Sequence, residues 1–223
     1  MGRYARVTYP ELTYHVINRG NNREVVFAEE EDYYHYLNTL QRYKKKFGFK
    51  LFAYCLMTNN VHLLIKVSEQ ASISKIMQCI TVAHIRQYNF KYRRCGHVWQ
   101  GRFNSPLVSE DDHLLNVMRY IEQNPLRAKM VKRMDEYRWS SYRLNIKEEN
   151  VCYQKLGDHE KSRINAYKEF VNVNLTPNEI QHLHKSTRNG SDYISKRFQD
   201  QIMELLPKKR KRGRPRNRDL NLV

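Results

Sequence analysis

The sequence predicts an α+β protein in which an antiparallel sheet carries the site, followed by a helical extension and a basic tail. Short runs rich in β-branched and aromatic residues alternate with longer stretches of helical period in the first two thirds of the chain. After about residue 145 the pattern becomes polar and helical, and residues 207–223 lack any apolar period. A tail of that composition is expected to be disordered.

The first elements follow in a simple order. Residues 12–18, LTYHVIN, predict a strand that is closed by the turn-like RGNN. Residues 29–47 predict a helix, because acidic side chains at its start and basic ones at its end suit the helix dipole. The runs KLFAYCLM and VHLLIKV predict two strands of an antiparallel hairpin, joined by the polar TNN.

Residues 72–92 predict a second helix, and FNSPLVS predicts an edge strand because Pro106 cannot donate to a central ladder. A third helix is expected at HLLNVMRYIEQNPLRA. The order β-α-β-β-α-β-α is that of a ferredoxin-like sandwich with helices on one face and one added helix. We therefore divide the chain into a domain at 1–145, a helical C-terminal extension at 146–206 and a basic tail at 207–223.

Composition points to a nucleic-acid partner. The formal net charge of the 223 residues is +17, and such a field attracts polyanions, of which nucleic acid is the commonest in a cell. The apolar runs are too short to span a bilayer, and no secretory signal is visible, so we expect a cytosolic, cytoplasmic protein without membrane contacts. The four cysteines lie far apart, which indicates reduced thiols rather than a zinc knuckle or a disulfide framework.

One strand carries a candidate site. In MTNNVHLLI, alternate side chains share a face, so Asn60 and His62 point one way while Val61 and Leu63 point toward the helices as core. A lone histidine on a strand is more often a packed core residue than a ligand. This strand is therefore not sufficient by itself to establish a site.

The third helix supplies a second group of polar residues. Its apolar positions, among them Leu114 and Met118, predict one buried stripe, and Tyr120, Asn124 and Arg127 fall on the opposite, polar side. Tyr120 and Asn124 are one turn apart and can serve one site. Pro125 is expected to end or kink the helix. The alternative is a surface tyrosine beside a helix stop.

These residues resemble a known family. MTNNVHLL is similar to the "HUH" strand of single-tyrosine transposases, in which two histidines flank a hydrophobic residue. GHVWQGRFNSPLVSEDDHLLNVMRYIEQNPLRAKMV resembles the block that carries the family's nucleophilic tyrosine. HVINRGNNREVVF, DEYRWSSY and RGRPR resemble the branch of REP-associated tyrosine transposases. The matching motifs occur in the same order and cover essentially the whole chain.

The resemblance implies a role for each matching residue. Tyr120 would be the nucleophile that attacks a DNA phosphodiester and keeps the 5′ phosphate as phosphotyrosine. His62 would be the second metal-binding histidine, and Asn124 the polar third ligand. Asn60 stands where the first histidine is expected. Because hard cations accept carbonyl oxygens, an amide at position 60 can still bind Mg²⁺ or Mn²⁺, though more weakly than an imidazole binds metals that prefer nitrogen.

A second His-hydrophobic-His triplet, His182-Leu183-His184, is not expected to bind metal. It follows Thr176 and Pro177 in a pattern that starts a helix. Two residues apart on a helix point about 200° from each other, so both imidazoles cannot hold one ion. We interpret them as surface or core residues.

Basic residues complete the expected DNA-binding surface. On the folded domain they are Arg19, Arg23, Arg102 and Arg127, and in the tail they are Lys209, Arg210, Arg212, Arg214 and Arg216. The family resemblance implies a metal-dependent enzyme, monomer or homodimer, that cuts and rejoins single-stranded DNA near palindromic hairpins. The leading alternative is a hairpin-DNA-binding protein with weakened or lost cleavage, because of Asn60. An RNA-binding ferredoxin-like domain is disfavoured, because the aromatic strand signature of that class does not occur.

Overall fold

The computed structural model describes residues 9–109, 112–147, 160–189 and 193–203. The strands are β1 (Thr13–Arg19), β2 (Lys50–Met57), β3 (Asn60–Lys66) and β4 (Leu107–Val108). The α-helices are α1 (Glu30–Phe47), α2 (Ile73–Lys91), α3 (Asp112–Glu122), α4 (Asn124–Arg127), α5 (Tyr142–Asn145), α6 (Glu160–Asn172), α7 (Pro177–Asn189) and α8 (Lys196–Met203). Short 3₁₀ turns occur at η1 (Asn21–Arg23) and η2 (Met134–Glu136).

The four strands form an antiparallel sheet in the order β2-β3-β1-β4. The predicted β-α-β-β-α-β-α order of elements is confirmed, as is the place of the Pro106 segment at the sheet edge. There, the Pro106 carbonyl accepts a hydrogen bond from the amide of His15 at 3.0 Å.

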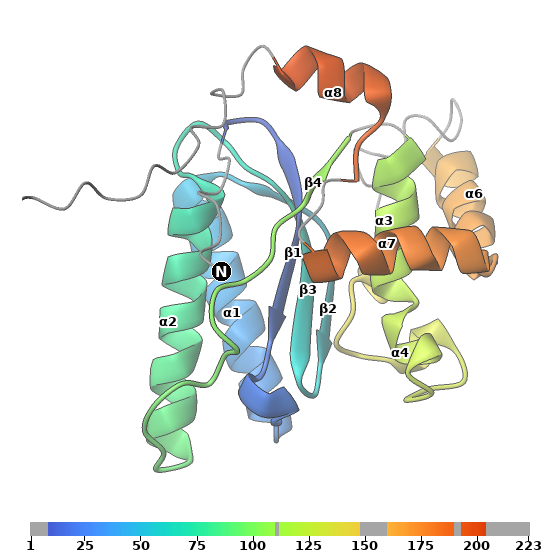
Figure 1. The fold of residues 1–223 in the computed structure, drawn as a ribbon. Coiled ribbons are helices and arrows are strands. Elements are labelled where there is room, and N and C mark those ends of the chain that lie inside the picture. The colour runs from blue at the N-terminus through green and yellow to red at the C-terminus, as the bar shows by residue number, and fades with distance from the viewer. Residues whose placement is uncertain (1–8, 110–111, 148–159, 190–192, 204–223) are drawn as a thin grey trace, which may run out of the picture.

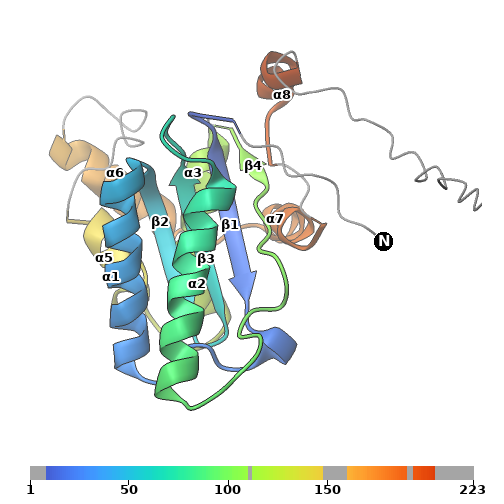
Figure 2. The same ribbon diagram turned by 90° about the vertical axis from the view of Figure 1, so that its left-hand side faces the viewer.

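Helices cover both faces of the sheet (Figure 1). The helices α1 and α2 lie side by side on one face, and the view turned by 90° shows them in front of the strands (Figure 2). They pack on Val61, Leu63 and Ile65, which confirms the predicted core side of β3. Leu64 faces the other way, into a second cluster with Leu114 and Met118 of α3. The prediction of helices on one face is therefore incomplete: α3 lies on the opposite face, with α6 and α7 packed on α3.

The third helix ends where the sequence predicts. α3 stops at Glu122, Gln123 separates it from α4, and Pro125 lies in the first turn of α4. Proline fits there because the first amides of a helix have no intrahelical partner. Among the described residues, no helix is both long and apolar enough to cross a bilayer. Cys55, Cys79 and Cys95 are free thiols; Cys152 lies outside the described residues, as does the tail at 207–223.

Candidate active site

Two histidines meet on the sheet face beneath α3. In the antiparallel register of β1 and β3, Ile17 is opposite His62 and His15 is opposite Leu64, so both imidazoles project from the same face. His15 Nε2 and His62 Nδ1 lie 3.0 Å apart in a buried hydrogen bond. The two side chains are only 1% and 7% exposed. Burial lowers the pKa of both, that of His62 to about 3, so both rings are neutral at physiological pH.

The turn before His62 is held by the segment that follows β1. Gly20 donates its amide to the Asn59 carbonyl at 2.8 Å, and Val26 donates to the Thr58 carbonyl at 2.8 Å. A side chain at position 20 would collide with the Glu24 carbonyl oxygen, which explains a glycine here. The residues that follow β1 therefore hold the β2–β3 turn in place through these hydrogen bonds. Asn60, the first residue of β3 after this turn, projects from the same face as His62.

Tyr120 of α3 packs against this histidine pair. Its ring centre lies 5.9 Å from that of His15 and 6.1 Å from that of His62, in edge-on contacts. The tyrosine is 4% exposed and Asn124 is also buried. The alternative of a surface tyrosine beside a helix stop is therefore wrong, because other elements cover this side of the helix. Burial raises the pKa of Tyr120, and the charge of Arg127 acts in the opposite direction.

Arg127 joins the tyrosine to the asparagine. Its guanidinium carbon lies 4.3 Å from the centre of the Tyr120 ring. One guanidinium nitrogen, Nη2, donates to the Tyr120 carbonyl at 2.5 Å and to Asn124 Oδ1 at 2.6 Å. The break at Gln123 lets α4 turn so that these three side chains converge. Sequence reasoning placed Arg127 on a DNA-binding surface, whereas the folded chain places it inside the candidate site.

The C-terminal extension covers the tyrosine. The His184 ring of α7 lies 5.9 Å from the Tyr120 ring, and the Thr187 carbonyl accepts a hydrogen bond from Asn104 Nδ2 at 2.9 Å. α7 is pinned to α3 by the ion pair of Arg119 and Glu179, at 2.8 Å. In Figure 1, α7 runs across α3 beside the sheet.

The triplet at 182–184 lies on α7, and the helix prediction there is confirmed. Leu183 is buried between two exposed histidines, as expected of residues that point apart. Its neighbour His184 nevertheless contacts Tyr120, a proximity that no local pattern predicts.

Glu122 is a buried acid that sequence reasoning missed. Its carboxylate accepts hydrogen bonds from Ser141 Oγ at 2.6 Å, Asn145 Nδ2 at 2.6 Å and the Tyr167 hydroxyl at 2.7 Å. Burial raises the pKa of Glu122 to about 7, although the three hydrogen-bond donors act to lower it. This cluster ties α3 to α5 and α6, two residues beyond Tyr120, and so holds the helix that presents the tyrosine.

The expected metal ligands fit a divalent cation only in part. Asn60 Oδ1 is buried and has no hydrogen-bond partner, which suits an acceptor that a hard cation would use. His62 has Nδ1 committed to His15, which leaves Nε2 for a ligand. Asn124 fits poorly, because its carbonyl oxygen accepts from Arg127. Within the described ranges, no group of three or more His, Cys, Asp or Glu side chains could hold a metal.

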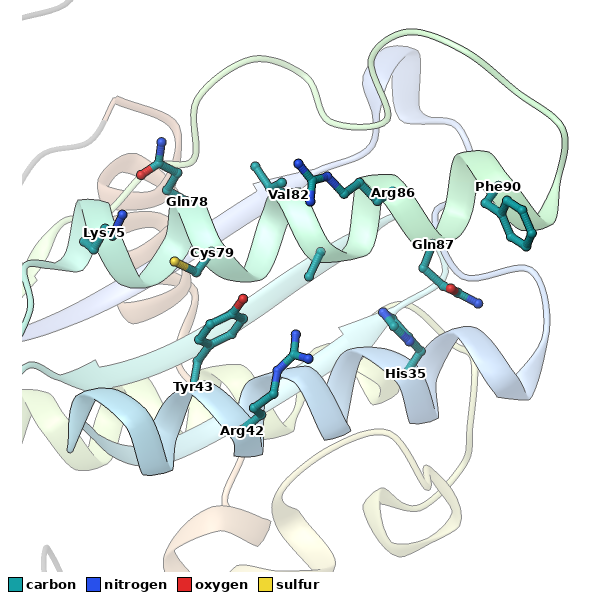
Figure 3. A pocket seen from close by; sticks show the side chains of 11 residues that line it. His35, Arg42, Tyr43, Lys75, Gln78, Cys79, Val82, Arg86, Gln87 and Phe90 are labelled. Carbon is teal, nitrogen blue, oxygen red and sulfur yellow. The ribbon is translucent and has the colours of Figure 1, made fainter.

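The expected DNA-binding arginines of the folded domain come from different elements. Arg19 and Arg102 nevertheless lie on neighbouring segments, because the Arg19 carbonyl accepts a hydrogen bond from the Gln100 amide at 2.8 Å. Arg19, at the end of β1, is exposed opposite Asn60. Arg23 is exposed at the end of η1, and Arg102 is exposed in the loop before β4. The predicted tail contacts from Lys209 to Arg216 lie outside the described residues. A groove of about 720 Å³ between α1 and α2 contains none of the candidate site residues. Its walls carry Arg42, Tyr43 and Phe90, on the sheet face opposite Tyr120 (Figure 3).

Comparison with known proteins places the fold and the sequence in one family. The family model described as IS200-like transposase matches residues 8–124. A Haemophilus influenzae protein described as a REP-associated tyrosine transposase is 28% identical over 118 residues, which cover 46% of this chain. The matched part is 64% of that protein, somewhat less than two thirds of its length.

A solved structure agrees at the level of the fold. The structure of a REP-associated tyrosine transposase bound to a REP hairpin is similar with a TM-score of 0.57 and 17% identity, over 66% of this chain and 87% of that one. The family resemblance inferred from the motifs is thus confirmed. Because the family model covers more than half of the sequence and includes both His62 and Tyr120, this chain belongs to the IS200-like transposase family.

Proposed function

We propose that this chain is a divalent-metal-dependent DNA transposase that cleaves and rejoins single-stranded DNA near palindromic hairpins through a 5′-phosphotyrosine on Tyr120. The observation that carries the proposal is the convergence of Tyr120, His62 and Arg127 on one sheet face. The relative solved with a REP hairpin supports the choice of substrate.

The chemistry needs no nucleotide cofactor. The Tyr120 oxygen loses its proton and forms a bond to phosphorus, and the bond from phosphorus to the 3′ oxygen breaks. The released 3′ oxygen takes up a proton, and rejoining reverses these steps with a new 3′ hydroxyl. When bound, Mg²⁺ or Mn²⁺ would polarise the phosphoryl oxygens. On this proposal His62 and Asn60 would hold the cation, and α7 must move from the ring before a phosphodiester reaches Tyr120.

A second candidate function is a hairpin-binding protein with weakened or lost cleavage. It is favoured by Asn60 in place of a histidine and by the coverage of Tyr120, which is 4% exposed. Basic residues along the chain would still bind phosphates in that case.

A labelled single-stranded hairpin separates the two functions. With Mn²⁺ present, a 3′-labelled strand should migrate covalently with the protein, and a 5′-labelled strand should be released with a free 3′ hydroxyl. Tyr120→Phe should abolish the adduct and leave hairpin affinity nearly unchanged, while Tyr43→Phe in the α1–α2 groove serves as the matched control. Binding without an adduct by the wild type would favour the binding protein, and an adduct in Tyr120→Phe would assign another nucleophile.

A further inference from the structure

Arg127 carries a positive charge that no described carboxylate neutralises. Arg119, on the same side of the molecule, pairs with Glu179. Within the described ranges, the ion pairs do not include Arg127, whose guanidinium donates to neutral oxygens of Tyr120, Asn124 and Gln123. A half-buried guanidinium stays protonated, because its pKa is far above neutrality even where burial lowers it. An anion is the partner that such a group lacks.

The geometry leaves donors for that anion. A guanidinium has five N–H groups. Three of them are used in the bonds to Tyr120, Asn124 and Gln123, the last of these long at 3.4 Å. The remaining two belong to Nε and Nη1. The guanidinium carbon lies 4.3 Å from the centre of the Tyr120 ring, and a side-chain hydrogen bond with Arg127 also acts to lower the pKa of Tyr120. A phosphorus atom that forms a bond with the Tyr120 hydroxyl oxygen would lie next to this same guanidinium, whose positive charge and remaining N–H groups favour an anionic phosphoryl oxygen.

Asn124 has a different partner from the one the resemblance implies. Its Oδ1 receives the 2.6 Å hydrogen bond from Arg127, and its Nδ2 is buried without a partner. An amide oxygen that holds a cationic side chain at this distance is an anchor for that side chain. The three residues Tyr120, Asn124 and Arg127 therefore form a unit on α3 and α4.

We propose that Arg127 binds the scissile phosphate beside Tyr120, and that Asn124 anchors Arg127 rather than serving as a metal ligand. The inference rests on the proposed cleavage reaction. The guanidinium would neutralise the negative charge on the phosphoryl oxygens as the Tyr120 oxygen attacks. A preorganised donor of this kind contributes on the order of a hundredfold to a rate. A purely structural role, in which Arg127 only caps the Tyr120 carbonyl at the end of α3, predicts no preference for a charged phosphate.

A neutral phosphate analogue distinguishes these roles. Adduct formation is measured at saturating hairpin DNA with either the natural phosphodiester or a methylphosphonate at the scissile position, which lacks one anionic oxygen. Arg127→Gln should lose on the order of a hundredfold in rate on the phosphodiester. On the methylphosphonate, the wild type and Arg127→Gln should differ by no more than about threefold, because there is less charge to neutralise. An equal loss on both substrates would overturn the proposal.

The controls separate charge from folding. Arg42→Gln removes the same charge from a guanidinium that lies 4.9 Å from the Tyr43 ring centre in the α1–α2 groove, and should leave the rate unchanged on both substrates (Figure 3). Circular dichroism and hairpin affinity check the fold of each variant. If Arg127→Gln does not fold, Arg127→Lys is run on the same two substrates, and the same comparison decides. A wild type that forms no adduct with the phosphodiester would refute the proposed function instead.

The Asn124 part has its own measurement. Asn124→Ala should leave Mn²⁺ binding unchanged in the electron paramagnetic resonance signal of free Mn²⁺. The double variant of Asn124→Ala and Arg127→Gln should form the adduct only slightly more slowly than Arg127→Gln alone. Residues that act through one contact do not have additive effects. Loss of Mn²⁺ binding in Asn124→Ala, or rate losses that multiply in the double variant, would show that Asn124 is a metal ligand instead.

Discussion

His15 on β1 and His62 on β3 share a hydrogen bond of 3.0 Å between Nε2 and Nδ1, so the site contains two histidines even though the HUH-like strand retains only one. A neutral imidazole has one N–H and one acceptor nitrogen, so one ring donates in this contact and the other accepts. If His62 donates from Nδ1, its Nε2 keeps a lone pair for a ligand or a proton. The hydrogen bond from His62 to His15 thereby sets the tautomer of His62, and so determines whether Nε2 is free to bind a ligand.

Acid should destabilise the protein through this pair. Their folded pKa values lie below the unfolded value near 6.5, so between these limits the unfolded chain binds protons that the folded chain does not. The stabilising contribution is complete above about pH 6.5 and is lost as the pH falls through the folded values, about 3 for His62. In metal-free buffer near pH 5, each histidine adds up to about 1.4 kcal/mol per pH unit to the slope.

His62→Gln tests this by removing one of the two groups. Urea unfolding between pH 5 and pH 7 should show an average slope of unfolding free energy against pH that is smaller by about 1 kcal/mol per pH unit than that of the wild type. An unchanged slope would mean that His62 is charged in the folded protein. His182→Gln, an exposed histidine of α7, is the control and should leave the slope as it is.

Glu122 should act in the opposite direction. Its folded pKa, about 7, lies above the unfolded value, so its contribution to stability is complete below about pH 4.5 and is lost as the pH rises through 7. A glutamine at this position cannot ionise, so the Glu122→Gln variant does not lose stability in this way as the pH rises. The unfolding free energy of the variant should therefore improve relative to the wild type by roughly 2–3 kcal/mol between pH 5 and pH 8. A difference independent of pH would show that the carboxylate is already charged at pH 5.

Local sequence patterns predicted the strands and helices that carry this site, but not which of them contact one another in the fold. Alternation along β3 correctly placed Asn60 and His62 on the face away from α1 and α2, and Pro125 correctly marked the end of α3. The pairing of His15 with His62 depends on the register between strands 47 residues apart in sequence, and no local pattern contains a register. The same holds for His184, which reaches Tyr120 from the C-terminal extension.

The burial of the polar side of α3 was not predictable for a related reason. Helical periodicity identifies a face rich in polar side chains, and such a face is commonly solvated. Here Tyr120 packs against His15, His62 and His184, and Asn124 accepts a hydrogen bond from Arg127, so this polar face is an internal contact. For Glu122, the only sequence signal was an acid near the end of α3, which is too weak to locate three donors from distant segments.

The basic tail should contribute to DNA affinity without adding specificity. Deleting residues 207–223 removes eight cations and one acid, a net change of 8 − 1 = 7 positive charges. The slope of log K against log salt should become shallower by about 0.7–0.9 for each phosphate that the shortened protein no longer neutralises. A full-length variant with the eight basic residues changed to glutamine should behave like the deletion. If both keep the wild-type slope, the tail does not touch DNA.

Asn60→His tests whether the departure from the two-histidine strand limits the site. Asn60 Oδ1 is buried and unpaired, on the same sheet face as His62, so an imidazole there would offer a second nitrogen ligand to one cation. Mn²⁺ accepts nitrogen ligands more readily than Mg²⁺ does, so the gain should be concentrated in Mn²⁺. The Mn²⁺ concentration for half-saturation, followed by electron paramagnetic resonance of the free ion, should fall by roughly tenfold, or about 1.4 kcal/mol. The Mn²⁺ concentration for half-maximal adduct formation should fall in parallel, while the Mg²⁺ concentration changes less.

The matched control is Asn59→His, at the neighbouring turn position whose side chain donates to the Arg23 carbonyl, and it should give no gain. Tighter Mn²⁺ binding without any adduct would mean that the barrier to cleavage lies outside position 60. The absence of both would show that the strand does not bind metal, and would favour the hairpin-binding protein over the transposase.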